Sequence, residues 1–163
     1  MQTKDEGFQR CDTPPDLGAV LHIIRVGATD RHTLVILSDA LVGVWTHYSL
    51  KRKRTIRCMG DAKNCEGCAD EMRKCWSGYL HVCKPTNGVQ GVLELTALAG
   101  NRVTDLFHGM ESIRGQKIFV YRERGNLKSP VAVEGLGPVE DGFYLPPKKD
   151  VFATLRRLWG IRE

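Results

Sequence analysis

The chain has 163 residues, of which 42% are hydrophobic and 26% are charged. This length fits one domain with an insertion, and this composition excludes a disordered chain. Lysine and arginine number 24 against 19 acidic residues, so the net charge of +5 and the pI of about 9.0 favour a polyanionic partner.

Residues 1–16 are polar and contain two prolines, which predicts a flexible N-terminal arm. Neither this segment nor any other contains the apolar run of a signal peptide or a membrane span. We therefore expect an intracellular (cytoplasmic) protein, of cellular, viral or mobile-element origin, with no membrane contact. Thiols stay reduced inside cells, so the six cysteines, four of them between residues 58 and 75, indicate metal binding more than disulfides.

Apolar, β-branched segments at 21–26 and 33–38 predict two strands, joined as a hairpin by the turn residues between them. A third strand is predicted at 42–49, where the side chains alternate in character. This pattern then stops, and turn-forming residues predict an irregular loop at 51–64.

A short helix is predicted from 65 to 76, where Met72, Cys75 and Trp76 would share an apolar face. This helix would bury Cys75. Two further strands are predicted at 78–83 and 91–98, separated by turn residues.

The segment 99–110 has apolar residues at helical spacing and predicts one amphipathic helix. Strands at 117–124 and 129–136 should form a second hairpin. A Pro-rich spacer at 138–147 then precedes a final helix, with Asp150 as its N-cap. The apolar stripe expected on this helix consists of Val151, Phe152, Leu155, Leu158 and Trp159.

From residue 79 onward the predicted order is strand, strand, helix, strand, strand. This is the order in an OB-fold, a five-stranded Greek-key barrel that often binds oligonucleotides. We therefore predict a mainly β protein, with an OB-fold-like five-stranded barrel over 17–137. A zinc-binding loop and helix would be inserted at about 47–76, and the Pro-rich spacer and C-terminal amphipathic helix would occupy 138–163.

Cys58, Cys65 and Cys68 form a three-thiol set, in which the Cys-x2-Cys spacing lets two sulfurs bind one ion. A structural zinc site needs a fourth ligand. The candidates are His47, Cys75, His81 and Cys83. A helix over 66–76 would separate Cys75 from Cys68 by roughly 10.5 Å along its axis, too far for one tetrahedral ion.

The favoured ligand set for one structural Zn²⁺ is His47, Cys58, Cys65 and Cys68. An all-cysteine site that uses Cys75 or Cys83, and buried reduced cysteines with no metal, are the alternatives. Three thiolates and a histidine leave no position for a water molecule, and no catalytic motif occurs. We therefore expect a protein that is not an enzyme.

A histidine, a basic loop and then Cys, Cys-x2-Cys leading into a short helix resemble the zinc subdomain of the T-even phage helix-destabilising, single-stranded DNA-binding proteins. The resemblance covers about residues 42–80 by motif and the rest by element order. It implies an OB-fold with an inserted zinc site. The family's histidine and three cysteines carry over to His47, Cys58, Cys65 and Cys68.

Single-stranded nucleic acid is bound by cations along its phosphates and by aromatic rings that stack on its bases. Five cations and no acid occur between residues 51 and 57. The expected contacts are Trp45, Tyr48, Lys51, Arg52, Lys53, Arg54, Arg57, Tyr79, Tyr121, Arg122 and Arg124. The alternative for each ring is packing in the core, and for the basic run it is a solvated loop.

The expected partner is single-stranded DNA, with RNA possible, bound largely independently of sequence during DNA replication, recombination or repair. One alternative is a zinc-containing regulator that binds duplex DNA or RNA, for which the helix at 65–76 supplies few recognition residues. Another is an interaction or assembly module, in which the C-terminal helix binds a replication partner or a second copy. A zinc-dependent enzyme is the least supported alternative.

Overall fold

The computed structural model of the chain describes residues 21–159, without the side chains of Leu158 and Trp159. The predicted N-terminal arm, together with Cys11, lies outside this range, and so do these two side chains of the predicted C-terminal stripe. The described part is mainly β, as expected. Within it, no helix combines the length and apolar character needed to cross a bilayer.

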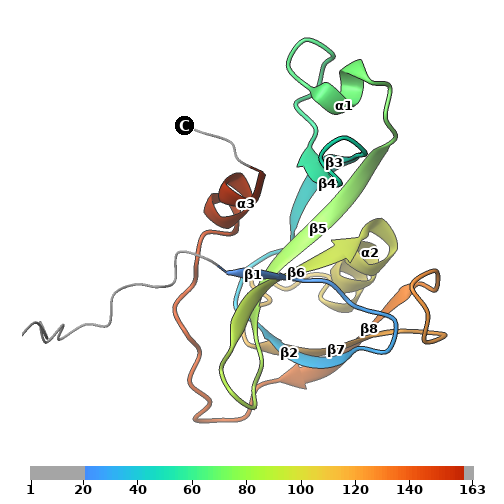
Figure 1. Cartoon of the computed structure of the whole chain (residues 1–163). Coiled ribbons are helices and arrows are strands. Elements are labelled where there is room, and N and C mark those ends of the chain that lie inside the picture. Colours follow the sequence, from blue (N-terminus) through green and yellow to red (C-terminus); the bar gives the residue numbers. More distant parts are fainter. Residues whose placement is uncertain (1–20, 160–163) are drawn as a thin grey trace, which may run out of the picture.

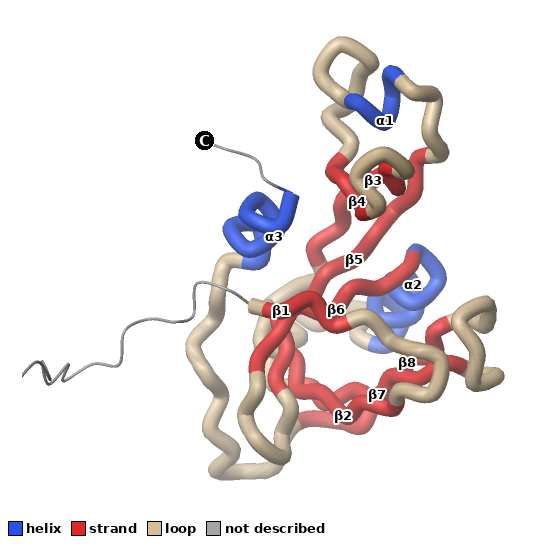
Figure 2. Tube along the Cα trace, viewed as in Figure 1, coloured by secondary structure: helices blue, strands red, loops and turns tan. Residues whose placement is uncertain are grey.

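One mixed sheet of eight strands forms the core of the protein (Figures 1 and 2). Its strands are β1 (His22–Ile24), β2 (Arg31–Ile36), β3 (Val42–Ser49), β4 (Arg54–Arg57), β5 (Lys74–Cys83), β6 (Gln90–Thr96), β7 (Gln116–Arg122) and β8 (Val131–Pro138). The helices are α1 (Glu66–Ala69), α2 (Ala97–Leu106) and α3 (Val151–Trp159). The strand order is β1-β6-β5-β2-β7-β8, and β3 pairs with both β5 and β4.

The prediction of a closed five-stranded barrel is wrong. β1 and β8 lie at the two ends of the hydrogen-bonded order, and no ladder among residues 21–159 joins them, so the sheet is open. The predicted hairpin between 21–26 and 33–38 is wrong too, because β1 instead pairs in parallel with β6. Both edges of β2 are already occupied by β5 and β7, so no edge remains for β1.

The strands β2, β5, β6, β7 and β8 together with α2 make a body that encloses one large apolar cluster. Ala99, Val103 and Phe107 of the α2 region pack into this cluster. The helix predicted at 99–110 is therefore confirmed, although it starts two residues and ends four residues earlier. The hairpin predicted between 117–124 and 129–136 is confirmed as β7 and β8.

A lobe, here residues 42–77, projects from this body and consists of β3, β4, α1 and the first part of β5 (Figure 1). The loop predicted at 51–64 is wrong in part, because β4 forms a hairpin with β3. The helix predicted at 65–76 ends at Ala69, and Glu71 then adopts a left-handed φ of 52°. The following residues pair with β3, so Cys75 is an exposed strand residue and not a buried helical one.

The C-terminal helix α3 packs on the base of the lobe. The Asp150 carboxylate accepts hydrogen bonds from the Phe152 and Ala153 N–H groups at 2.8 and 3.3 Å, which confirms it as the N-cap. Val151 and Leu155 are buried in a second cluster with Val44 and Tyr79. α3 therefore covers the joint between β3, β5 and the body.

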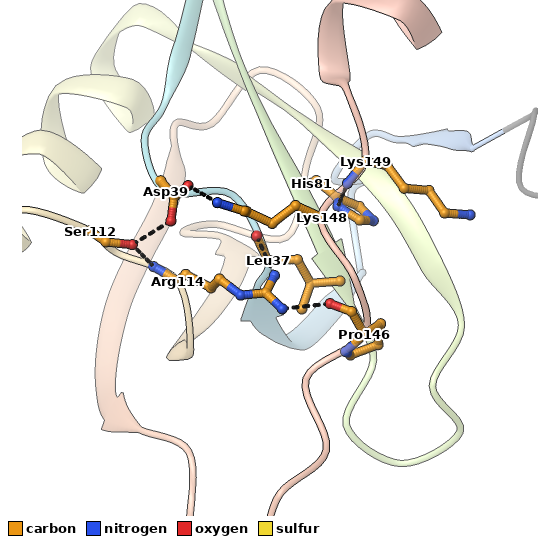
Figure 3. Close-up of polar contacts among 8 residues, drawn as sticks. All are labelled: Leu37, Asp39, His81, Ser112, Arg114, Pro146, Lys148 and Lys149. Atoms are coloured by element: carbon orange, nitrogen blue, oxygen red, sulfur yellow. Dashed lines mark hydrogen bonds and ion pairs between the residues drawn. The ribbon is translucent and has the colours of Figure 1, made fainter.

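The second half of the Pro-rich segment 138–150 is attached to the body by polar contacts (Figure 3). The Arg114 guanidinium donates to the Leu37 carbonyl at 2.8 Å and to the Pro146 carbonyl at 2.7 Å. The Asp39 carboxylate accepts from Ser112 at 2.7 Å and pairs with Lys148 at 2.6 Å. This segment is therefore a strap that leads α3 from the end of β8 to the lobe.

Three glycines from different elements surround the Trp76 indole, which is half-buried. A Cβ atom would lie 2.7 Å from the ring at Gly43 in β3, 2.8 Å from it at Gly78 in β5 and 2.4 Å from it at Gly100 in α2. Contacts this short are not tolerated between carbon atoms. The indole therefore packs directly on the backbone where the lobe meets α2.

Gly100→Ala should destabilise the protein by about 1–3 kcal/mol, because the new methyl group overlaps the Trp76 ring. Alanine inside a helix normally stabilises by up to ~1 kcal/mol relative to glycine, so the expected sign is reversed. Urea unfolding measures the change, with the exposed helix substitution Asn101→Ala as the control. A stabilised Gly100→Ala protein would contradict the described packing.

Candidate metal centre and nucleic-acid surface

Four side chains of the lobe converge on one point. His47 lies on β3, Cys58 directly follows β4, Cys65 precedes α1 and Cys68 lies in α1. Their ligand atoms all lie within 4.8 Å of one another. The Cys68 Sγ is 3.6 Å from the Cys58 Sγ and 3.5 Å from the His47 Nε2. These are the four residues that the sequence predicts as ligands.

The His47 imidazole is buried, with 2% of the residue exposed, and backbone carbonyls fix its tautomer. Its Nδ1 lies 3.0 Å from the Met72 oxygen and 3.2 Å from the Arg73 oxygen. A carbonyl oxygen only accepts, so Nδ1 carries the proton and donates it. Nε2 is then the lone-pair atom, and it faces the sulfurs as a metal ligand must.

The three thiols differ in how readily they lose a proton. Burial raises the pKa of Cys58, but the Gly60 N–H and His47 outweigh it and lower the pKa to about 7. Burial likewise raises the pKa of Cys65, yet backbone N–H groups, including that of Met59, bring it below its usual range. Hydrogen bonding to Cys58, followed by burial, raises the pKa of Cys68 to about 11. A divalent ion would displace the remaining thiol protons.

This donor set fits zinc. Three sulfurs and one imidazole nitrogen are ligands that zinc prefers, and sulfurs bound to one tetrahedral zinc lie about 4 Å apart. The cluster could therefore hold one metal ion such as zinc. Four protein ligands complete a tetrahedral shell, which is the arrangement of a structural site.

Sequence reasoning missed Gly67, which lies against the candidate ligand His47. A Cβ atom at this position would be 2.3 Å from the His47 Cγ, so any side chain here would displace the imidazole. The only sequence signal was the glycine immediately before the last cysteine of Cys65-Glu-Gly-Cys68.

The other candidate ligands lie outside this cluster. Cys83 is buried in the body, and Cys75 is exposed on β5. His81 is also buried, and its two ring nitrogens have partners in the strap and in β6. Its Nδ1 accepts from the Lys149 N–H at 3.3 Å, so the protonated Nε2 donates to the Gln90 side-chain oxygen at 2.9 Å.

The predicted phosphate-binding cations lie on the β3–β4 hairpin, here called the basic hairpin (residues 49–57). Lys51, Arg52 and Lys53 occupy its turn, Arg54 and Arg57 lie on β4, and all five are exposed. The Arg52 Nε pairs with the Glu66 carboxylate of α1 at 3.0 Å. An exposed pair contributes less than about 1 kcal/mol, so a phosphate could replace Glu66.

The predicted aromatic contacts divide into two groups. Trp45 and Tyr48 on β3 are 53% and 52% exposed, so their rings are accessible to a ligand. Tyr79 does not lie at the surface as its predicted role requires, because it is 1% exposed and its hydroxyl donates to Glu94 at 3.0 Å. It fills the joint beneath α3. Trp76, which pairs with Trp45 across the β3–β5 ladder, was not among the predicted contacts.

The three predicted contacts near the end of β7 lie in the body. The Tyr121 hydroxyl donates to Glu134 at 2.8 Å. The Arg122 guanidinium donates to the Val26 carbonyl at 3.0 Å and to the Ser129 carbonyl at 2.8 Å. Arg122 therefore links β7 to neighbouring loops, and its role is at least partly structural. Arg124 is exposed beyond the end of β7.

No protein-family model, curated protein or solved structure matches the chain. Fold and site together define a mainly β protein with an open sheet and a histidine–cysteine cluster that could hold one metal ion.

Cys68→Ser should lose the bound metal, because it removes a sulfur that lies 3.5 Å from the His47 Nε2 and 3.6 Å from the Cys58 Sγ. Elemental analysis of freshly reduced, untagged protein should give one zinc per wild-type chain and much less for this variant. Cys75→Ser is the matched control and should keep its zinc. Equal metal content in all three proteins, or substoichiometric zinc in the wild type, would contradict the assignment.

Gly67→Ala should weaken zinc binding by about 10- to 100-fold, because the new methyl group displaces the His47 imidazole. This is the usual effect of changing a residue that positions a metal ligand. Competition with a chromophoric chelator measures the affinity. Ala69→Ser changes an exposed residue of the same helix and should leave the affinity unchanged. An unchanged affinity in Gly67→Ala would show that the imidazole can move without cost.

Proposed function

We propose that the protein binds single-stranded DNA, largely independently of base sequence. Single-stranded RNA is the alternative ligand. Its role would lie in replication, recombination or repair, inside a cell where the thiols stay reduced. The observation that carries this proposal is the basic hairpin, which presents five exposed cations and no acid beside a cluster able to hold zinc.

The cluster gives this hairpin a defined position. His47 and Cys58 lie in or next to the two strands of the hairpin, and the register pairs His47 with Ile56. The Arg52–Glu66 pair adds a contact between the hairpin turn and α1. Cations held in this way lose less conformational entropy on binding a phosphate backbone than those of a loose loop.

The topology of the body also supports the proposal. β2, β5 and β6 form a meander, α2 follows it, and β7 and β8 continue from the other edge of β2. This is the strand order of an OB-fold with its closing ladder missing, and OB-folds commonly bind oligonucleotides. The T-even phage proteins, which the sequence resembles, insert a histidine–cysteine zinc site in such a fold.

A binding role suits the site better than catalysis does. The four candidate ligands would fill the coordination shell of zinc and leave no position for substrate or water. A duplex-binding regulator has less support, because α1, at four residues, is too short for a recognition helix. The C-terminal helix buries Val151 and Leu155 against its own sheet, which reduces the surface left for a partner.

The affinity for oligo-dT should fall with salt at a slope of log K against log salt of roughly −3, as expected for four to five phosphate contacts on a single strand. Lys51→Ala/Lys53→Ala should make this slope shallower by about 1.4. Fluorescence anisotropy at several salt concentrations measures the affinity for oligo-dT, oligo-U and a blunt duplex, with and without chelator. Lys84→Ala/Lys128→Ala, with the same loss of charge in the body, should leave the slope unchanged.

A flat salt dependence would remove the electrostatic basis of the proposal. Preference for the duplex would favour the regulator, and strong dependence on one base sequence would contradict sequence-independent binding. No binding to any of the three probes would favour an assembly module.

A further inference from the structure

A groove with a volume of about 520 Å³ lies where the lobe leaves the body. β5 runs beyond the end of β6 toward α1 at this place (Figure 1). The last pair between the two strands is Ser77 with Thr96, so the preceding residues of β5 pair only with β3. Two tryptophans and four cationic residues are among its lining residues, namely Arg25, Trp45, Arg73, Lys74, Trp76 and Arg122.

Two indoles lie on the same face of the lobe at this groove. Trp45 and Trp76 are directly opposite across the antiparallel ladder, so their side chains point to the same side. Trp76 is held against the three glycines described above, whereas 53% of Trp45 is exposed. The Lys74 ammonium lies 5.6 Å from the centre of the Trp45 ring. A cation therefore lies over one face of this exposed ring, so a base would stack on the other face or displace the ammonium.

The charge of the groove is positive. Four of its residues are cationic, and Glu94 is the one acid that lines it. Glu94 is already engaged, because its carboxylate pairs with the Arg25 Nε at 2.9 Å and accepts from the Tyr79 hydroxyl at 3.0 Å. Arg73 and Lys74 are exposed and extend the positive surface along β5. An anionic ligand with a planar ring complements this surface.

We propose that this groove is a nucleotide-binding subsite, in which a base stacks on Trp45 and its phosphate lies beside Arg73 and Lys74. The inference rests on the proposed function and names a surface distinct from the basic hairpin. An extended peptide could instead pair with the open edge of β5. That edge has only three residues, Lys74 to Trp76, which is shorter than the five or six of a typical strand.

The metal centre would set the position of this subsite. The Met72 and Arg73 carbonyls accept from the His47 Nδ1, so the backbone that enters the groove is hydrogen-bonded to a metal ligand. One imidazole would thereby connect an ion, held through its Nε2, with the residues proposed to bind phosphate. Metal removal should weaken the subsite even though no groove residue is itself a ligand.

Binding of an eight-residue oligo-dT, followed by anisotropy and by tryptophan fluorescence, tests the inference. Trp45→Ala should weaken binding by about 5- to 100-fold, the usual loss when a stacking ring is removed. In the wild type, a base stacked on Trp45 should quench its fluorescence. Trp45→Phe should keep most of the affinity and lose most of this quenching. Arg73→Ala should also weaken binding while keeping its zinc. The control Tyr144→Ala removes another ring, 76% exposed on the strap, and should change nothing.

The outcomes separate the inference from the proposed function. If the wild type binds the oligonucleotide and Trp45→Ala and Arg73→Ala bind it equally well, the groove is not the subsite, while binding through the basic hairpin still stands. If an octaglutamate peptide competes as strongly as the oligonucleotide, the surface recognises charge alone and the stacking subsite is overturned. If the wild type binds no oligonucleotide, both proposals fail together.

Discussion

The hydrogen bonds from the His47 Nδ1 to the Met72 and Arg73 carbonyls connect the two halves of the lobe. The lobe has few buried apolar residues of its own beyond Val44 and Ile56. A segment with so little core needs another source of stability, and a bound ion can supply it in small domains. The histidine both faces the cysteine sulfurs and fixes the course of the chain into β5.

The body stabilises the other end of the lobe by packing. The Trp76 indole rests on backbone at three glycines, and α3 covers Val44 and Tyr79. A polar cluster at the tip and an apolar joint at the base therefore hold the same pair of strands. The basic hairpin lies near the first and the groove lies near the second.

Some features could be predicted because their signals are local. The ligand spacing from Cys58 to Cys68, the Asp150 cap and the β7–β8 hairpin each depend on residues close in sequence. The path of β1 could not, because its pairing with β6 depends on which edges β2 has left free. The prediction of a helix at 65–76 was wrong for a similar reason. The apolar residues there recur at helical spacing, but pairing of the start of β5 with β3 outweighs this local signal. The burial of Tyr79 depends on α3, and the lack of room for a side chain at Gly67 depends on His47. Both contacts are distant in sequence.

The strap along residues 138–150 has a consequence for the shape of a ligand. Through Arg114 and Asp39 it is attached to the body, and through α3 it reaches the lobe, so the lobe cannot swing outward without breaking these contacts. A groove between two parts held in this way keeps its width. If the groove is the nucleotide subsite proposed above, its fixed width would favour a single stacked ring over a base-paired helix.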